Sequence, residues 1–262
     1  MTERPNMAYL QTLQQALLPA IYEAGRAIMA VHKKQISSRL KPDGSPVSEA
    51  DEAAEAILLP ALGQAAPNIT VISEENAASH HITPPELFFL VDPLDGTKEF
   101  LKPDGEGSFT VNIGLIYQGS PIFGMVLAPA FDTLYCGIVG HGAVKIINGK
   151  QQTISVRDVP DEGAVAVASA SHRDEATNRW LADHAISQIK SIGSSLKFCL
   201  IAEGQADVYP RFSPTMEWDT AAGDGVLRAA GGLMMAQSYT PYSYGKPDYR
   251  NAPFIARGKW LR

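Results

Sequence analysis

Apolar residues recur at steps of three and four over the first part of the chain, which predicts a long amphipathic helix. They are Leu10, Leu13, Leu17, Ile21, Ala24, Ile28 and Val31. A polar connection follows, and its Pro-Asp-Gly at 42–44 is typical of a turn. A second helix is expected from Ser48, as its N-cap, to Leu62, with Glu49 and Asp51 in the first turn.

The pattern then changes to short apolar runs that predict strands. Runs at 71–72 and 87–91 each end in acidic residues. Residues 109–115 alternate between apolar and polar positions, which predicts a strand with one face on a core. Further short strands are expected at 121–126, 133–139 and 143–147, and Asn148-Gly149 predicts a hairpin turn after them.

Strands alternate with helices in the second half, as in an α/β lobe. Strands are expected at 164–168, 191–192 and 207–209, and helices at 174–185, 196–203 and 218–230. Glycine, proline and charged residues gather at 149–162, where a seam is expected. The chain is therefore expected to form a layered α+β and α/β fold, with a helical and antiparallel-sheet lobe at 1–150 and a smaller α/β lobe at 151–262.

Composition and charge exclude several classes of protein. A chain of 262 residues with 45% hydrophobic and 19% charged residues is typical of a globular protein. The net charge of -6 argues against a surface that coats nucleic acid, so an anionic ligand would need metal ions or a few placed basic residues. Cys136 and Cys199 lack C-x-x-C spacing, which argues against a thiolate zinc site or a disulfide framework and favours a reducing cytoplasm. No signal peptide or membrane-spanning apolar run is expected.

The segment 87–97 carries the strongest chemical signal. A hydrophobic strand ends at Asp92 and Asp95, with Pro93 between them and Gly96 after them. Carboxylates at such a strand end need a cation or hydrogen-bond donors. Mg²⁺ prefers carboxylate and carbonyl oxygens, so Asp92, Asp95 and the Leu94 carbonyl are candidate ligands. Turn formation and helix capping are the alternative roles for these aspartates.

Three other acidic residues are candidates whose spacing alone does not bring them together. Glu74 follows the strand at 71–72, Asp51 lies in a helix first turn, and Asp219 opens the helix at 218–230. A solvated loop, a helix-dipole interaction and an N-cap are the respective alternatives. Glu75, beside Glu74, is expected to be solvated.

These acidic segments resemble the signatures of the inositol monophosphatase-like, lithium-sensitive metal phosphatases. The matching stretches are Ile72–Glu75, Asp92–Thr97 and Trp218–Gly223. Longer stretches are similar to the CysQ-type 3'(2'),5'-bisphosphate nucleotidases, in order, at 41–51, 92–100, 193–199, 202–211 and 217–223. Ser48 departs from the pattern, where threonine would be expected. The resemblance implies an inositol monophosphatase-like sandwich of αβαβα layers.

The resemblance also implies a two-metal hydrolysis that needs no protein nucleophile. By position, Glu74, Asp92 and the Leu94 carbonyl would hold one Mg²⁺, and Asp92, Asp95 and Asp219 a second. Asp51 would bind a third, weaker ion or orient its waters. Thr97, hydrogen-bonded near Asp51 or Glu74, would position and deprotonate the attacking water, so Thr97, Glu74 and Asp51 are the implied catalytic residues.

A second phosphate would bind in the α/β lobe. Gly193–Ser195 opens a helix whose free N–H groups suit an anion, and Lys197 and Arg211 supply positive charge. A helix cap for Ser194, a solvated Lys197 and a structural His172 are the alternatives, and Trp218 and Tyr209 are expected in the core rather than beside an adenine. The implied substrate-binding residues are Asp95, Gly96, Thr97, His172, Ser194, Lys197, Arg211 and Asp219.

The expected reaction is removal of the 3'-phosphate from adenosine 3',5'-bisphosphate (PAP) to give AMP, with the sulfated nucleotide PAPS converted to APS as a further activity. An inositol or sugar phosphatase, a non-catalytic nucleotide and metal sensor, and a carboxylate-pair glycosidase are the alternatives. The expected partner is a small phosphorylated nucleotide, not a nucleic acid polymer. The expected protein is a monomer or homodimer in the cytoplasm, free or peripheral at the cytoplasmic face of the inner membrane.

Overall fold

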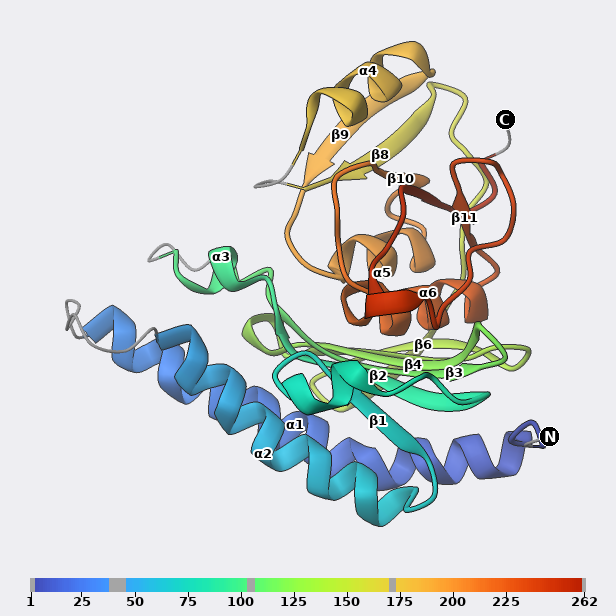
Figure 1. Ribbon diagram of the computed structural model, residues 1–262. Coiled ribbons are helices and arrows are strands. Elements are labelled where there is room, and N and C mark those ends of the chain that lie inside the picture. Colours follow the sequence, from blue (N-terminus) through green and yellow to red (C-terminus); the bar gives the residue numbers. More distant parts are fainter. Residues whose placement is uncertain (1–2, 38–45, 103–106, 170–172, 261–262) are drawn as a thin grey trace.

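The structure, a computed structural model, describes residues 3–37, 46–102, 107–169 and 173–260 (Figure 1). Its helices are α1 Met7–Ser37, α2 Pro46–Ala65, α3 Thr97–Phe100, α4 Glu175–Asp183, α5 Leu196–Ala202 and α6 Trp218–Ala229. Short 3₁₀ turns lie at η1 Ala77–His81, η2 Pro129–Phe131 and η3 Pro247–Tyr249. Across these ranges, no helix has both the length and the hydropathy that crossing a lipid bilayer requires.

The first sheet contains seven strands in chain order, β1 to β7. β1 pairs with β2 in parallel, and every later neighbour is antiparallel. The strands are β1 Thr70–Ser73, β2 Leu87–Asp95, β3 Thr110–Tyr117, β4 Ser120–Ala128, β5 Thr133–Ile138, β6 Gly142–Ile147 and β7 Lys150–Ile154.

The second sheet contains five strands in the order β11-β12-β10-β8-β9. β8 is parallel to both of its neighbours, β10 and β9, while β12 is antiparallel to both β10 and β11. Their bounds are β8 Ala164–Ala168, β9 Ile186–Ser191, β10 Val208–Arg211, β11 Leu233–Ala236 and β12 Phe254–Arg257.

The two sheets and the helices stack as five layers (Figure 1). Helices α1 and α2 cover one face of the first sheet, α5 and α6 lie between the sheets, and α4 covers the far side of the second sheet. One apolar core fills the space under α1 and α2, and a second surrounds α5 and α6. The expected αβαβα sandwich is therefore confirmed.

Most of the expected elements form where the hydrophobic pattern predicts them. The long first helix, the strand at 87–91 and the hairpin at Asn148-Gly149 are confirmed, and both turn residues adopt positive φ. Cys136 and Cys199 are buried free thiols, as expected. In the first helix and the strand at 87–91, the apolar positions of the sequence pattern are the positions that the fold buries.

Several expectations about secondary structure are wrong. Helix α2 already begins at Pro46, so Ser48 lies inside its first turn and not at the cap. The strand expected at 191–192 is β9, which begins at Ile186. The sequence pattern did not predict β7, β11 or β12, because half-exposed or short strands carry weak apolar signals. The division into lobes at residue 150 stays a prediction, although β7 continues the first sheet to Ile154.

Strand β3 is buried on both faces, and not on one face as its alternation predicts. Its apolar positions Val111 and Ile113 face the core under α1 and α2. Thr110 and Asn112 are also fully buried, because α5 and α6 cover the opposite face. Polar residues at this strand therefore need hydrogen-bond partners inside the protein.

Helix α6 packs unusually close to the first sheet because glycines line the contact. A Cβ at Gly114 would lie 2.8 Å from the Ala221 side chain, and a Cβ at Gly225 would lie 2.8 Å from the Phe123 carbonyl oxygen. A Cβ at Gly124 would overlap the Ala222 carbonyl oxygen. The first turn of α6, which carries Asp219, is held against the sheet by this backbone contact.

Replacing Gly124 with alanine is expected to destabilise the protein strongly. The added methyl would force α6 away from β4, an overpacking that costs about 1–3 kcal/mol or more. Gly63→Ala is the matched control, because Gly63 lies on exposed α2 with no atom near its Cβ position. That change is expected to be neutral or to stabilise by about 0.5–1 kcal/mol. Thermal unfolding of both variants checks the pair, and equal unfolding temperatures would contradict the close packing.

Candidate active site

A pocket of about 330 Å³ opens where the ends of several elements meet between the sheets. It collects the end of β2, the start of α3, the start of α5, strand β10 and the first turn of α6. Its volume suits a ligand of nucleotide size. Its lining is Glu74, Asp92, Leu94, Asp95, Gly96, Thr97, Lys98, Glu99, Ser169, Gly193, Ser194, Lys197, Phe198, Tyr209, Arg211, Thr215, Asp219 and Thr220.

The lining contains nearly all of the residues that the sequence singles out. Asp51 is buried but is not in the pocket wall. His172 lies outside the described residues. The other ten line one cavity: Glu74, Asp92, Leu94, Asp95, Gly96, Thr97, Ser194, Lys197, Arg211 and Asp219.

Three acidic residues converge on one side of the pocket. Glu74, Asp92 and Asp219 each offer a carboxylate oxygen, and these oxygens lie within 4.8 Å of one another. Glu74 and Asp92 come from β1 and β2, which are parallel neighbours, so their carboxyl ends reach the same edge of the sheet. The Glu74 N–H donates to the Val91 carbonyl oxygen at 3.1 Å, which fixes this junction.

The electrostatics of this cluster fit a bound cation. Burial, and then the charges of Glu74 and Asp95, raise the pKa of Asp92 well above its ordinary value. Burial raises the pKa of Glu74 to about 7, against an opposing hydrogen bond with Asp92. Asp92 Oδ1 accepts from the Leu94 N–H at 2.9 Å, but its buried Oδ2 has no hydrogen-bond partner in the described part of the chain. An orphaned carboxylate oxygen among acidic neighbours is the donor set that a hard divalent cation prefers.

Asp95 is fixed from the second half of the chain. Its Oδ2 accepts from the Ser195 backbone N–H at 2.6 Å. The Ser195 hydroxyl contacts Asn112 Oδ1 at 2.6 Å and Thr110 Oγ1 at 2.9 Å, so β3 and the start of α5 are joined by buried polar groups. Burial raises the pKa of Asp95 to about 6, against the opposing charge of Lys197.

This contact changes the expectation for the start of α5. The N–H groups of Gly193–Ser195 were expected to be free for an anion, but the Ser195 N–H is occupied by Asp95. Ser194 is buried with a positive φ, and its hydroxyl accepts from the Leu196 N–H at 3.4 Å. This part of the helix N-terminus thus orients an acidic side chain.

Two buried cations line the same pocket as the acidic cluster. Lys197 Nζ donates to the Ser194 carbonyl oxygen at 2.6 Å and lies 5.2 Å from the Tyr209 ring centroid. Burial lowers the pKa of Lys197 to about 8, and this burial excludes the alternative of a solvated lysine. Arg211 is 9% exposed, and its guanidinium donates to the carbonyl oxygens of Ser213 and Pro214. Positive charge held in low dielectric is costly unless an anion joins it.

Thr97 and Gly96 form the rim of the pocket beside Asp95. Gly96 adopts a φ of 96°, and a Cβ there would lie 3.0 Å from the Ser108 carbonyl oxygen, so only glycine suits this turn. Thr97 is exposed at the start of α3. A hydrogen bond from its hydroxyl to Asp51 or Glu74 was expected, but none forms among the described residues. The charge of Asp51 nevertheless raises the pKa of Glu74 and Asp92.

Some lining residues were missed by sequence reasoning. Ser169, Thr215 and Thr220 reach the pocket only through the packing of distant segments, and no motif marks them. Thr220 directly follows Asp219 in the helix, which is the one available signal. Trp218 is in the core as expected and stacks on His80 at 4.7 Å between ring centroids.

A model of the inositol monophosphatase family matches residues 9–259. The chain belongs to the inositol monophosphatase family. It is 44% identical over 236 residues to the 3'(2'),5'-bisphosphate nucleotidase CysQ of Salmonella typhimurium (strain LT2), covering 87% of this chain and 94% of that protein. The corresponding protein of Escherichia coli (strain K12) is 44% identical over 224 residues, or 84% of this chain and 89% of its own.

Solved structures of the inositol monophosphatase family share the fold. CysQ from Bacteroides thetaiotaomicron superposes with a TM-score of 0.84 at 36% identity, covering 98% of this chain and 100% of that chain. The inositol monophosphatase from Anabaena (Nostoc) sp. PCC 7120 gives a TM-score of 0.72 at 25% identity, covering 96% and 92%. The resemblance to CysQ-type proteins and the prediction of a phosphatase are therefore confirmed.

The acidic cluster predicts a stability that depends on pH and metal. Burial, followed by the charge of Glu75, raises the pKa of Asp51 to about 8, and the pKa of Glu74 is about 7. Since unfolded carboxyls titrate near about 4, the folded metal-free protein binds these protons more tightly. The resulting stabilisation is complete below about pH 4 and is lost as the pH rises through about 7 and 8.

We expect the unfolding temperature of the chelator-treated protein to fall between about pH 5 and pH 8. Saturating Mg²⁺ is expected to recover most of that loss at the upper end, because a ligand bound only by the folded state stabilises it. Thermal unfolding at each pH, with chelator or with Mg²⁺, checks this. Glu74→Gln should flatten the slope of the metal-free protein, and a slope unchanged by Mg²⁺ would contradict the prediction.

Proposed function

We propose that this protein is a Mg²⁺-dependent phosphomonoesterase that removes the 3'-phosphate of adenosine 3',5'-bisphosphate (PAP), giving AMP and phosphate. The observation that carries the proposal is one pocket whose lining holds both an acidic cluster and the buried cations Lys197 and Arg211. A substrate with two phosphates could use the acidic cluster through metal ions and the cations directly. The nucleotidase names of the similar CysQ proteins support the same substrate class, and conversion of PAPS to APS follows from the same binding mode.

The proposed metal ligands divide into two sets that share Asp92. Glu74, Asp92 and the Leu94 carbonyl would hold one Mg²⁺, and Asp92, Asp95 and Asp219 would hold the second. The convergence of Glu74, Asp92 and Asp219 and the orphaned Asp92 Oδ2 support these sets. Asp51 lies behind the cluster, where its charge affects Glu74 and Asp92, and we assign to it a third, weaker ion or the waters around one.

The protein's own residues orient the attack on phosphorus. When bound, the ions supply a more acidic water and neutralise charge on the phosphate and its leaving oxygen. The Thr97 hydroxyl stands at the rim without a partner among the described residues, so it can rotate to hold the attacking water. We assign to Glu74 and Asp51, whose pKa values lie near neutrality without metal, the removal of a proton from that water.

Substrate binding is assigned to the opposite wall. Lys197 and Arg211 would bind the 5'-phosphate, with the Ser194 hydroxyl beside them, and His172 is proposed as a further contact. Gly96 allows the backbone next to Asp95 and Thr97 to approach the phosphate that is cleaved. An inositol monophosphate has no second phosphate for Lys197 and Arg211. We propose a cytoplasmic monomer or homodimer, and the buried free thiols agree with a reducing compartment.

Asp95→Asn is expected to lower kcat by about 100-fold or more, because it removes charge that the transition state needs. The fold should survive, since asparagine keeps an oxygen for the Ser195 N–H. Asp161→Asn is the matched control, because it makes the same chemical change at an exposed carboxylate outside the pocket lining. Steady-state phosphate release and thermal unfolding check both variants, and near-normal turnover of Asp95→Asn would remove Asp95 from the metal site.

The substrate is tested by comparing kcat/KM on PAP, 3'-AMP and inositol 1-phosphate. We expect PAP to be preferred over both by at least about tenfold, which corresponds to about 1.4 kcal/mol of binding to the second phosphate. Arg211→Met should reduce kcat/KM on PAP much more than on 3'-AMP, which lacks that phosphate. Preference for inositol 1-phosphate would favour an inositol phosphatase, and a protein that binds Mg²⁺ and PAP without releasing phosphate would be a sensor.

A further inference from the structure

Asp219 is oriented by a segment that precedes its helix. Its Oδ2 accepts from the Met216 backbone N–H at 2.8 Å. The direction of this carboxylate therefore depends on where residues 215–217 lie. The same short segment supplies Thr215 to the pocket wall, and the first turn of α6 supplies Thr220.

One buried side chain, Asn251, contacts this segment through hydrogen bonds. Asn251 Nδ2 lies 2.9 Å from Thr215 Oγ1, 2.5 Å from the Met216 carbonyl oxygen and 3.1 Å from Thr220 Oγ1. Its backbone N–H donates to the Thr215 carbonyl oxygen at 2.9 Å. One amide thus contacts both threonines of the pocket wall and the residue that donates to Asp219.

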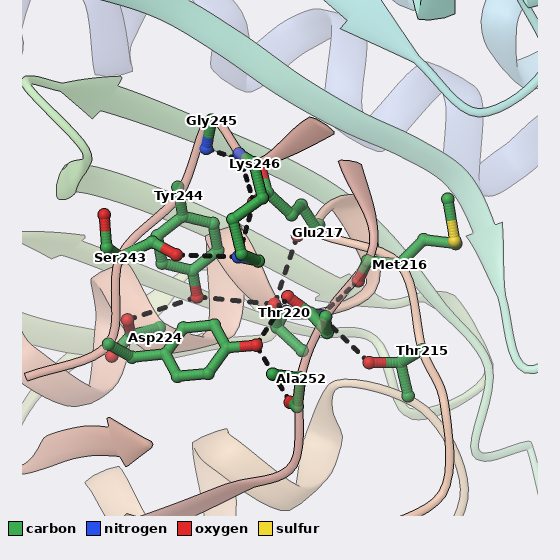
Figure 2. A network of polar contacts seen from close by, with 12 residues as sticks. Thr215, Met216, Glu217, Thr220, Asp224, Ser243, Tyr244, Gly245, Lys246 and Ala252 are labelled. Carbon is green, nitrogen blue, oxygen red and sulfur yellow. Dashed lines mark hydrogen bonds and ion pairs between the residues drawn. The ribbon is translucent and has the colours of Figure 1, made fainter. Parts of the chain in front are cut away.

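Asn251 is itself fixed, so it can transmit rigidity to the pocket. Its Oδ1 accepts from the Tyr242 hydroxyl at 3.1 Å. Next to it, the buried Glu217 carboxylate accepts from the backbone N–H groups of Gly245 and Lys246 and pairs with the Lys246 ammonium at 2.5 Å. The Glu217 N–H donates to the Tyr249 carbonyl oxygen at 2.7 Å. The C-terminal loop and the segment before α6 are therefore joined by contacts of both Asn251 and Glu217, and Figure 2 shows Glu217 beside Gly245 and Lys246.

We infer that Asn251 is a positioning residue that sets the Asp219 carboxylate for metal binding and holds the Thr215 and Thr220 wall of the pocket. The inference rests on the proposed role of Asp219 as a Mg²⁺ ligand. Asn251 does not line the pocket, so it acts through Met216 and the two threonines. The Asn251 amide supplies two N–H donors to the Met216 carbonyl and the threonine hydroxyls while its oxygen accepts from Tyr242, and loss of such an outer contact typically weakens metal binding by about 10–100-fold.

The test measures Mg²⁺ affinity by calorimetry, well below the unfolding temperature, in the full-length protein. Asn251→Ala is expected to weaken Mg²⁺ binding by about tenfold or more, and kcat should recover in part at high Mg²⁺ concentration. Asn251→Asp keeps the shape but places an oxygen against the Met216 carbonyl, so it should weaken Mg²⁺ binding in the same direction. If the Asn251→Ala protein does not fold, the Mg²⁺ affinity of the Asn251→Asp protein is the deciding measurement.

A merely structural role is separated by a matched control. Arg157→Met leaves the buried Asp207 carboxylate without its paired guanidinium, which should lower the unfolding temperature without touching residues 215–220. Its Mg²⁺ affinity should stay within about twofold of wild type. Wild-type Mg²⁺ affinity in folded Asn251→Ala or Asn251→Asp would overturn the inference. If the wild-type protein binds Mg²⁺ but does not hydrolyse PAP, that result would contradict the proposed substrate. The positioning role of Asn251 would still be tested by the Mg²⁺ affinities of the variants.

Discussion

The crowding of carboxylates at the junction of the two sheets is the constraint on which the rest of the site depends. Glu74, Asp92 and Asp219 place oxygens within 4.8 Å of one another, in surroundings that raise their pKa values. Such an arrangement opposes ionisation of its own members unless a cation joins it. The cluster therefore destabilises the metal-free protein locally at neutral pH, and under the proposed function a bound divalent cation would offset this cost.

Holding such a cluster requires rigid supports, and the fold supplies two of the same kind. Asp95 is tied to the Ser195 backbone N–H, and Asp219 to the Met216 backbone N–H. Each N–H is fixed in turn by buried polar side chains, through Asn112 in one case and Asn251 in the other. Buried polar groups of this kind are stable only when their partners are in place, which makes the orientation of the carboxylates specific.

Close backbone packing sets how near α6 lies to the first sheet, and so where Asp219 lies in the site. Glycines on β3, β4 and α6 let the helix approach the sheet more closely than any side chain would allow. This approach brings Asp219, which lies more than a hundred residues along the chain from Asp92, to the end of β2. The opposite wall, with Lys197 and Arg211, is then set by how α5 and β10 pack on the other side of α6.

The sequence by itself determined the local elements and the chemical type of the site. Periodicity predicts the long helices and most strands of the first sheet, and the acidic strand end at Asp92 and Asp95 predicts a site for hard cations, because these signals lie within a few residues. Only the tertiary structure decided that Asp219 and Glu74 join Asp92, that Lys197 is buried, and that Ser195 and Asn251 support the carboxylates. Those contacts join segments far apart in the chain, so they depend on packing of layers that no local pattern encodes. The short strands β11 and β12 were missed for the same reason, since pairing and not periodicity creates them.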